Sequence, residues 1–326
     1  MNAIGHNFSN VSIYASSHGP SGCVSEQPEL PGDSFVGSYD DGSDGVEAKD
    51  GRAVCDLKSK SEPVTITVIA TNDIHGQYGK LPKVSGIIKD LKAKYPDAVV
   101  VDGGDSSFNP PSSNKVRFGT AVKLMSAMDY DIMALGNHEF QYGKTAAVEE
   151  FVKKVDAQVI CANVHSDKGG YLNGVQPYVI KDINGVKAAF VSVTELEKHK
   201  PGKDIERPID CMNRLMPELQ EQADIIIGLN HQGLSDDAKL AKAVDGISLI
   251  ISSHDHEATE EPIQIGSYPN HTYIVESGSH CQMVGLSQIT VDPDTHEILD
   301  FKFTNYPVET YQCSPDPVIQ KMLSRQ

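Results

Sequence analysis

The sequence predicts an α/β fold in which a sheet core is covered by helices. Apolar, β-branched runs alternate with amphipathic helical stretches through the middle of the chain, and the last third contains strands alone. With 39% hydrophobic residues in 326, the chain is also long enough to bury a sizeable core. Alternation of this kind gives sheets flanked by helices, and the β-rich end supplies strand pairs that close the sheet core.

The elements follow one another in a regular order. Residues 64–70 (VTITVIA) form a continuous β-branched run typical of a buried strand, and residues 83–94 place apolar side chains at helical spacing. Further strands are predicted at 98–101, 131–135, 158–162, 224–229 and 248–252, and further helices at 118–128, 145–155, 212–222 and 236–244. A hairpin is predicted at 178–181 and 187–194, joined by Asn184-Gly185. The last strands are predicted at 272–276, 282–291 and 298–304.

Composition divides the chain into three parts. Residues 1–62 hold 8 Gly, 11 Ser and ten acidic residues against four basic ones, which predicts a disordered acidic segment. Residues 63–310 form the predicted folded domain, and residues 311–326 are predicted to be a tail or a short helix.

Charge and composition narrow the class of protein. A net charge of −17 argues against binding nucleic acid or an anionic membrane through a basic patch. There is no apolar run of transmembrane length and no N-terminal signal pattern, so we expect a cytoplasmic protein. The six cysteines are widely spaced and predict neither a zinc knuckle nor a disulfide framework. The sequence does not indicate the oligomeric state.

Five short sequences that carry metal-binding side chains each follow a predicted strand. Groups at the carboxyl ends of strands in an open α/β sheet converge on one crevice, so we expect these side chains to meet. In chain order they are Asp73 and His75, Asp105, Asn137 and His138, His231, and His254 and His256.

The residue types suit a pair of divalent ions, with zinc, manganese, cobalt or iron favoured by imidazole and carboxylate ligands. Two such ions can generate hydroxide and hold a phosphoryl oxygen. Singly, each residue has a plain structural explanation, such as a buried ion pair at Asp73 and His75 or a core histidine at His231. Metal binding is favoured because all five sequences directly follow a predicted strand. A second Asp-x-His, at Asp294 and His296, lies in a predicted turn between strands, and we interpret it as a chance match.

These stretches resemble the metallophosphatase domain of the 5′-nucleotidase family, part of the calcineurin-like phosphoesterase superfamily. The matching sequences are IATNDIHGQYG, VDGGDSS, AMDYDIMALGNHEFQYG, IGLNHQG, SSHDHE and VESGSHCQMVGLSQITVD. GNHEF preceded by DYDIMAL is the most specific of them. The resemblance implies a four-layer α/β/β/α sandwich that hydrolyses small phosphate monoesters such as 5′-nucleotides.

The resemblance also implies roles for the residues. One metal ion would be held by Asp73, His75, Asp105 and His256, and the second by Asp105, Asn137, His231 and His254. Asp105 would bridge the two ions. His138 would be a catalytic histidine that is not a ligand and that stabilises charge on the departing oxygen.

Three departures from the family pattern matter. Gln141 stands where the family usually has an aspartate that pairs with the catalytic histidine, so we expect weakened or retuned acid chemistry. A serine replaces the more usual glycine before the last histidine pair. The chain ends soon after the predicted sandwich, so we expect the nucleoside-binding domain of family nucleotidases to be absent.

Two other functions stay open at this point. The same pair of ions can attack a phosphodiester, and the chain could instead bind metal with weakened catalysis. His280, in SGSHCQ, is a further candidate to line the site.

Overall fold

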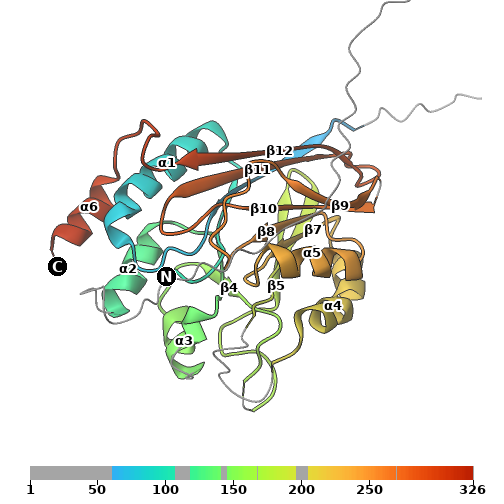
Figure 1. Cartoon of the computed structure of the whole chain (residues 1–326), viewed down its shortest axis with the longest axis horizontal. Helices are drawn as coiled ribbons and strands as arrows, with labels where there is room; N and C mark the ends of the chain where they lie inside the picture. The colour runs from blue at the N-terminus through green and yellow to red at the C-terminus, as the bar shows by residue number, and fades with distance from the viewer. Residues whose placement is uncertain are drawn as a thin grey trace, which may run out of the picture. The chain divides into compact units, whose positions relative to one another are not determined.

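Two six-stranded mixed sheets form the centre of the protein (Figure 1). The computed structural model describes residues 61–106, 118–140, 145–166, 168–195, 205–268 and 270–325. In spatial order the first sheet is β12 (Ile298–Pro307), β11 (Met283–Val291), β1 (Val64–Thr71), β2 (Val99–Asp102), β3 (Ile132–Ala134) and β4 (Gln158–Ile160). The second is β5 (Tyr178–Ile183), β6 (Val186–Val191), β7 (Ile225–Leu229), β8 (Leu249–Ser252), β10 (Asn270–Glu276) and β9 (Ile263–Ser267).

The strand directions place many carboxyl ends at one edge of each sheet. Strands β1 to β4 run parallel, and β11 and β12 continue that sheet in antiparallel pairing. Strands β6, β7, β8 and β10 are likewise parallel, with β5 and β9 as antiparallel edge strands. Loops that follow the parallel strands are therefore gathered together within each sheet.

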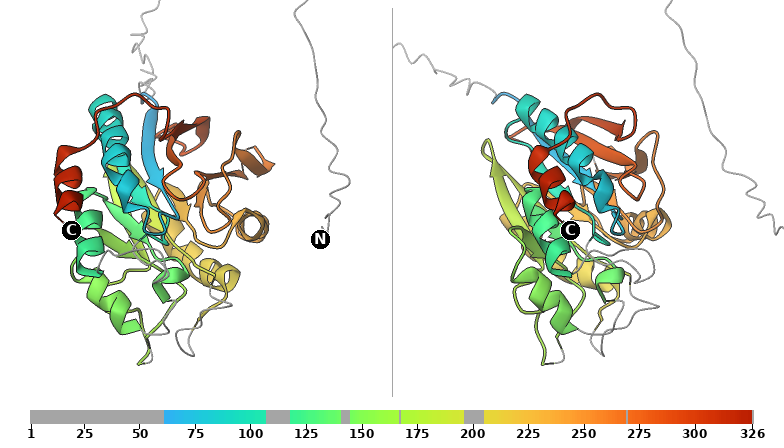
Figure 2. Two further views of the ribbon diagram at one scale, coloured as in Figure 1. Left: turned by 60° about the vertical axis from the view of Figure 1, so that its left-hand side comes forward. Right: turned by 90° about the vertical axis from the view of Figure 1, so that its left-hand side faces the viewer.

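Helices cover the outer face of each sheet, as both views in Figure 2 show. The first sheet is covered by α1 (Leu81–Lys94), α2 (Phe118–Ala127), α3 (Thr145–Val152) and α6 (Pro317–Ser324). The second is covered by α4 (Pro208–Gln222) and α5 (Leu234–Ala243). Two short 3-10 helices, η1 (Tyr78–Lys80) and η2 (His138–Phe140), follow β1 and β3.

Strand β1 is buried on both faces, which explains why its sequence is apolar throughout. Ile66 and Val68 are fully buried in the core between the two sheets, whereas Ile69 is fully buried in the core beneath the helices of the first sheet. Side chains alternate between the faces of a strand, so a strand buried on both faces needs an unbroken apolar run. A third core separates the second sheet from α4 and α5. The four-layer α/β/β/α sandwich is thus confirmed.

Most elements lie where the sequence predicted them, and β9 was missed. Four of its five residues are exposed, so this edge strand lacks the buried apolar pattern by which strands are identified. The predicted disordered segment, residues 1–62, falls almost entirely outside the described residues, and the domain boundaries at 62 and 310 stay predictions. Among the described residues, no helix has the length and apolarity needed to cross a bilayer.

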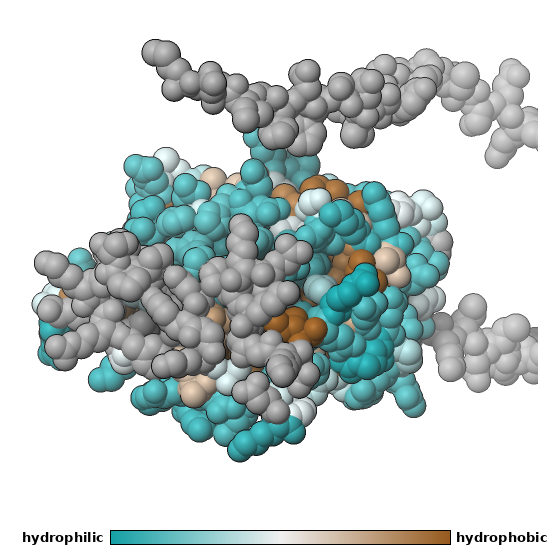
Figure 3. Space-filling model, turned by 60° about the horizontal axis from the view of Figure 1, so that its bottom comes forward, coloured by the Kyte–Doolittle hydropathy of each residue, from teal (hydrophilic) through white to brown (hydrophobic). Residues whose placement is uncertain are grey.

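The described residues visible in Figure 3 are largely hydrophilic, and the hydrophobic ones visible there form small separate patches. This pattern fits the acidic composition of the chain. The apolar residues of the described part are used mainly in the three cores.

Asp316 attaches α6 to α1. Its side chain accepts hydrogen bonds from the backbone N–H of Val318 (2.8 Å), the Ser85 hydroxyl (2.7 Å) and the Lys89 ammonium (2.5 Å). It is 2% exposed, and it caps the helix whose residue Ile319 is buried in the first core. Burial raises the pKa of Asp316, but the donors from Lys89, Ser85 and Val318 outweigh burial and lower it.

We predict that Asp316→Ala lowers the free energy of unfolding by about 1–3 kcal/mol, because a helix cap and the hydrogen bonds that a buried carboxylate accepts from Ser85 and from the exposed Lys89 are lost together. The folded-state pKa is lowered, so the contribution is present above the unfolded-state pKa and is lost as pH falls through the folded-state pKa. Denaturant unfolding at pH 7 and pH 3 measures both effects. Asp300→Ala, which removes an exposed pair with Lys302, is the control and should change stability by less than about 0.5 kcal/mol. Equal effects of the two substitutions would contradict this account.

Candidate metal centre

All eight residues predicted from the strand-end sequences lie in one cluster. They come from the loops after β1, β2 and β3 of the first sheet and after β7 and β8 of the second. The site therefore lies where the carboxyl ends of parallel strands from both sheets meet. Three groups of side-chain donor atoms within 4.8 Å of one another occur among the described residues: Asp73, His75 and His256; His75, Asp105 and His138; and Asp73, Asp105 and His231.

One half of the cluster is built around Asp73. His75 Nε2 and His256 Nε2 are 2.8 Å apart, and each lies 3.4 Å from Asp73 Oδ1. That oxygen is buried and makes no hydrogen bond. The other carboxylate oxygen, Oδ2, accepts from Asn72 Nδ2 (2.8 Å) and from the backbone N–H of His254 (2.9 Å). These two donors fix the carboxylate so that Oδ1 faces the imidazoles.

The other half of the cluster is built around Asn137. Its Oδ1 lies 3.1 Å from His231 Nε2 and 2.9 Å from His254 Nδ1. Asp105 stands between the two halves, since its Oδ2 is 3.2 Å from His231 Nε2 and 3.9 Å from His75 Nε2. A single carboxylate thus reaches both halves of the cluster.

His231 is held in one orientation by its surroundings. Its ring Nδ1 lies 2.9 Å from the backbone carbonyl of Gly103, and its backbone N–H donates to the carbonyl of Val193. A carbonyl can only accept, so Nδ1 carries the proton and Nε2 is directed at Asp105 and Asn137. A partner of this kind behind the ring is what a metal-binding histidine needs.

The backbone is left-handed at five of the eight residues. The φ angles are 49° at Asp73, 47° at His75, 55° at Asp105, 101° at His254 and 65° at His256. Residues other than glycine adopt such angles at a cost of about 1–3 kcal/mol each, and they concentrate at functional sites. The strained positions coincide with the donor side chains, so the loops are shaped to aim those side chains inward.

Glu139 organises the loops, although its residue type and position predicted no role for it. Its buried carboxylate accepts from the backbone N–H groups of Asp105 (2.9 Å), Ser106 (3.1 Å) and Gly136 (2.8 Å). It thereby joins the loop after β2 to the loop after β3. Its place within the specific sequence GNHEF was the only signal for it.

The electrostatics of the cluster favour positive charge beside Asp73 and Asp105. Burial raises the pKa of Asp73 and of Asp105, but the charge of His231, together with the other imidazoles close to the two carboxylates, outweighs burial and lowers both. Burial lowers the pKa of His231, but the charges of Asp105 and Asp73 outweigh it and raise the pKa to about 10. Two neighbouring buried carboxylates thus favour positive charge on whatever lies between them.

The donor set fits divalent metal ions. Such a site is expected to have oxygen and imidazole donors, a buried carboxylate oxygen without a hydrogen-bond partner, and a group that orients a ligand histidine. Asp73 Oδ1 is such an oxygen, and the carbonyl of Gly103 orients His231. In the described part of the chain no cysteine belongs to the cluster.

His138 and His280 complete the rim. The His138 side chain is 26% exposed, its Nε2 lies 3.8 Å from Asp105 Oδ2, and its backbone N–H donates to Asp105 Oδ1. The rings of His138 and His280 lie 5.1 Å and 5.0 Å from that of His75. The sequence raised His280 only as a further candidate, and Gln141 lies outside the described residues.

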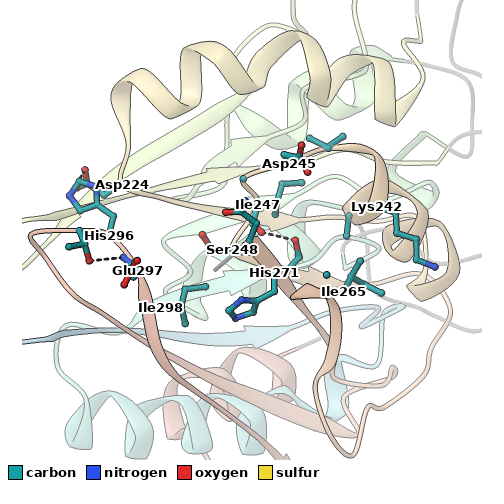
Figure 4. Close-up of a pocket in the computed structure, with 17 residues that line it drawn as sticks. Asp224, Lys242, Asp245, Ile247, Ser248, Ile265, His271, His296, Glu297 and Ile298 are labelled. Atoms are coloured by element: carbon teal, nitrogen blue, oxygen red, sulfur yellow. Dashed lines mark hydrogen bonds and ion pairs between the residues drawn. The ribbon is translucent and has the colours of Figure 1, made fainter. Parts of the chain in front are cut away.

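A hollow away from the cluster lies at the amino-terminal ends of the parallel strands in the second sheet (Figure 4). It has a volume of about 530 Å³, and His271 and the Asp224–His296 ion pair line it. None of the eight predicted residues borders it. The second Asp-x-His sequence, Asp294 to His296, therefore lies away from the cluster of eight residues. This position agrees with our interpretation of that sequence as a chance match.

The fold and the site together define a metallophosphoesterase. Residues 66–258, more than half of the chain, match the family model described as calcineurin-like phosphoesterase, and the chain belongs to that family.

Relatives of known sequence agree with this assignment. The chain is 30% identical over 234 residues to the uncharacterized metallophosphoesterase YunD of Bacillus subtilis, covering 68% of this chain and 49% of that protein. It is 26% identical over 278 residues to a probable 5′-nucleotidase of Treponema pallidum, covering 72% of this chain and 46% of that protein. The chain thus spans about half the length of these relatives.

Solved structures share the fold. The 5′-nucleotidase precursor of Thermus thermophilus superposes with a TM-score of 0.71 at 22% identity, covering 80% of this chain and 58% of that one. The calcineurin-like phosphoesterase YfkN of Bacillus subtilis gives a TM-score of 0.68 at 22% identity, covering 81% and 97%. At this identity the likeness concerns the fold.

A buried acid lies at the end of β10, near the cluster. Glu276 is fully buried, and neither carboxyl oxygen has a hydrogen-bond partner among the described residues. Burial, followed by the negative charges of Asp73 and Asp255, raises its pKa to about 9. The side chain is therefore a neutral acid at neutral pH.

We predict that Glu276→Gln stabilises the metal-free protein increasingly as pH rises from 5 to 8.5. The unfolded chain releases this proton above about pH 4.5, whereas the native protein keeps it up to about pH 9, so native stability falls across that window. Glutamine has no proton to lose, and the difference from the unsubstituted protein should grow by a few kcal/mol, on the order of one per pKa unit. Denaturant unfolding with chelator present measures it. A difference that does not change with pH would refute a raised pKa at Glu276.

Proposed function

We propose that the protein hydrolyses phosphate monoesters of small molecules with two divalent metal ions bound in the cluster. The observation that carries this proposal is the position of Asp105, whose Oδ2 approaches histidines in both halves of the site. A bridging carboxylate of this kind is a usual feature of two-metal hydrolytic sites, where ions lie about 3.5–4 Å apart.

The ligands divide naturally between the two halves. Asp73, His75, Asp105 and His256 would hold one ion, and Asp105, Asn137, His231 and His254 the other. Zinc, manganese, cobalt and iron suit these donors. When bound, the ions would supply the positive charge that polarises a phosphoryl group and acidifies a water molecule.

His138 would act on the leaving group. Its backbone is tied to Asp105 Oδ1 while its side chain remains partly exposed at the rim. An imidazole in that position can donate a proton to the departing alkoxide, which matters most for poor leaving groups. Its Nε2 also falls into a group of possible ligands with His75 and Asp105, so the experiment must separate the two roles.

The relatives make 5′-nucleotides the first substrates to examine, because several are named 5′-nucleotidases. The test is turnover of 4-nitrophenyl phosphate with added manganese, zinc or cobalt, followed by a panel of nucleotides, other monoesters and diesters. Preference for diesters would indicate a phosphodiesterase. Metal binding without turnover of any ester would indicate a binding protein and refute the proposal.

We predict that the reconstituted protein holds close to two transition-metal ions and that Asp105→Ala loses both, because one carboxylate would bridge them. Elemental analysis after gel filtration measures the content. His296→Ala, which changes the histidine paired with Asp224 in the hollow of Figure 4, is the control and should retain both ions. A reconstituted wild-type protein with one ion or none would refute the two-metal site.

We predict that His138→Ala keeps its metal ions and lowers turnover of alkyl phosphates by about 10²–10⁴-fold, because a proton donor is removed. Turnover of 4-nitrophenyl phosphate, whose leaving group needs little protonation, should fall much less. Loss of an ion would instead show that His138 is a ligand. Full activity on alkyl phosphates would show that it is not the acid.

A further inference from the structure

A cavity of about 780 Å³ is lined in part by Lys80 and by Cys281, the residue that follows His280 in the chain. Cys281 and Val308, which are 5% and 3% exposed, contribute apolar wall together with Met283. Lys80 and Lys83 line the same cavity. Its size falls within the range that accommodates a small organic molecule.

One turn of the chain borders both the cluster and the cavity. The ring of His280 lies 5.0 Å from that of His75 and 5.3 Å from that of His256, and its backbone N–H donates to the carbonyl of Asp73. The next residue, Cys281, lines the cavity. The Lys80 ammonium donates to the backbone carbonyl of His280 at 3.1 Å, which places a cation at the border between the two spaces.

The cavity is positively charged although the chain is strongly acidic. In the described part of the chain neither Lys80 nor Lys83 forms an ion pair with a carboxylate, and each donates to a backbone carbonyl instead. For Lys83 that carbonyl belongs to Glu309, whose exposed carboxylate is the single acidic group among the described residues of the lining. Two ammonium groups against one carboxylate leave the cavity with a net positive charge.

We infer that this cavity receives the leaving group of the substrate and that the preferred leaving group combines an apolar body with an anionic group of its own. The inference rests on the proposed phosphoesterase function. With the scissile phosphate at the cluster, the body of the ester extends past His280 along the wall of Cys281, Met283 and Val308. Its anionic group then meets Lys80 and Lys83.

Two matched esters test the inference. One is the phosphate ester of 3-(4-hydroxyphenyl)propanoate, and the other is the phosphate ester of the corresponding primary amide. The two have nearly the same shape and the same phenolic leaving group, but only the first carries the second anion. We expect kcat/KM to favour the carboxylate by roughly tenfold, the effect of one charge-assisted hydrogen bond. The double variant Lys80→Gln/Lys83→Gln should reduce that ratio to within about twofold of one.

Lys123→Gln/Lys153→Gln, which removes two exposed lysines outside the cavity lining, is the charge-matched control and should keep the full ratio. Equal kcat/KM for the two esters in the unsubstituted protein, or a ratio that survives the double substitution, would overturn the inference. So would turnover of 4-nitrophenyl phosphate without turnover of either matched ester. Absence of turnover on all three esters would instead mean that the proposed function itself is wrong.

Discussion

The burial of two neighbouring carboxylates is the constraint on which the rest of the site depends. Asp73 and Asp105 are at most 1% exposed and follow adjacent parallel strands. A buried charge without compensation costs several kcal/mol, so positive charge must lie close to both. The imidazoles around them supply it when protonated, and divalent ions would supply more of it in the space that the same donor atoms enclose.

The left-handed turns that carry these groups are tolerated because the surrounding layers hold them. Strand β1 is buried on both faces, through Ile66 and Val68 on one side and Ile69 on the other. Its end is therefore fixed before the turn at Asp73 begins. Glu139 adds backbone hydrogen bonds that join two of the loops. Strain at the donor residues is thus opposed by core packing and by backbone hydrogen bonds, neither of which uses the metal-binding side chains.

The sequence predicted what depends on periodicity and missed what depends on local geometry. The run at 64–70 predicted a buried strand, and the rule that strand ends converge gathered all eight candidate residues. Strand β9 escaped because an exposed edge strand has no apolar period. Glu139 escaped, and His280 was raised only as a further candidate, because their places depend on which N–H groups and rings surround them. Such neighbours come from distant parts of the chain, and no spacing within a motif encodes them.

The acidity of the chain is compatible with a phosphate substrate because repulsion by the net charge acts at long range, whereas attraction by the groups of the site acts at short range. A net charge of −17 repels anions at long range, but salt screens that repulsion beyond about 8–10 Å. Within the site, the field is set by groups a few ångströms away, where cations, imidazoles and the ammonium of Lys80 dominate under the proposed function. The average surface therefore governs how often an anion arrives, and the local donors govern whether it stays. A small ester needs only the local field, whereas a nucleic acid would lie across the repelling surface as well.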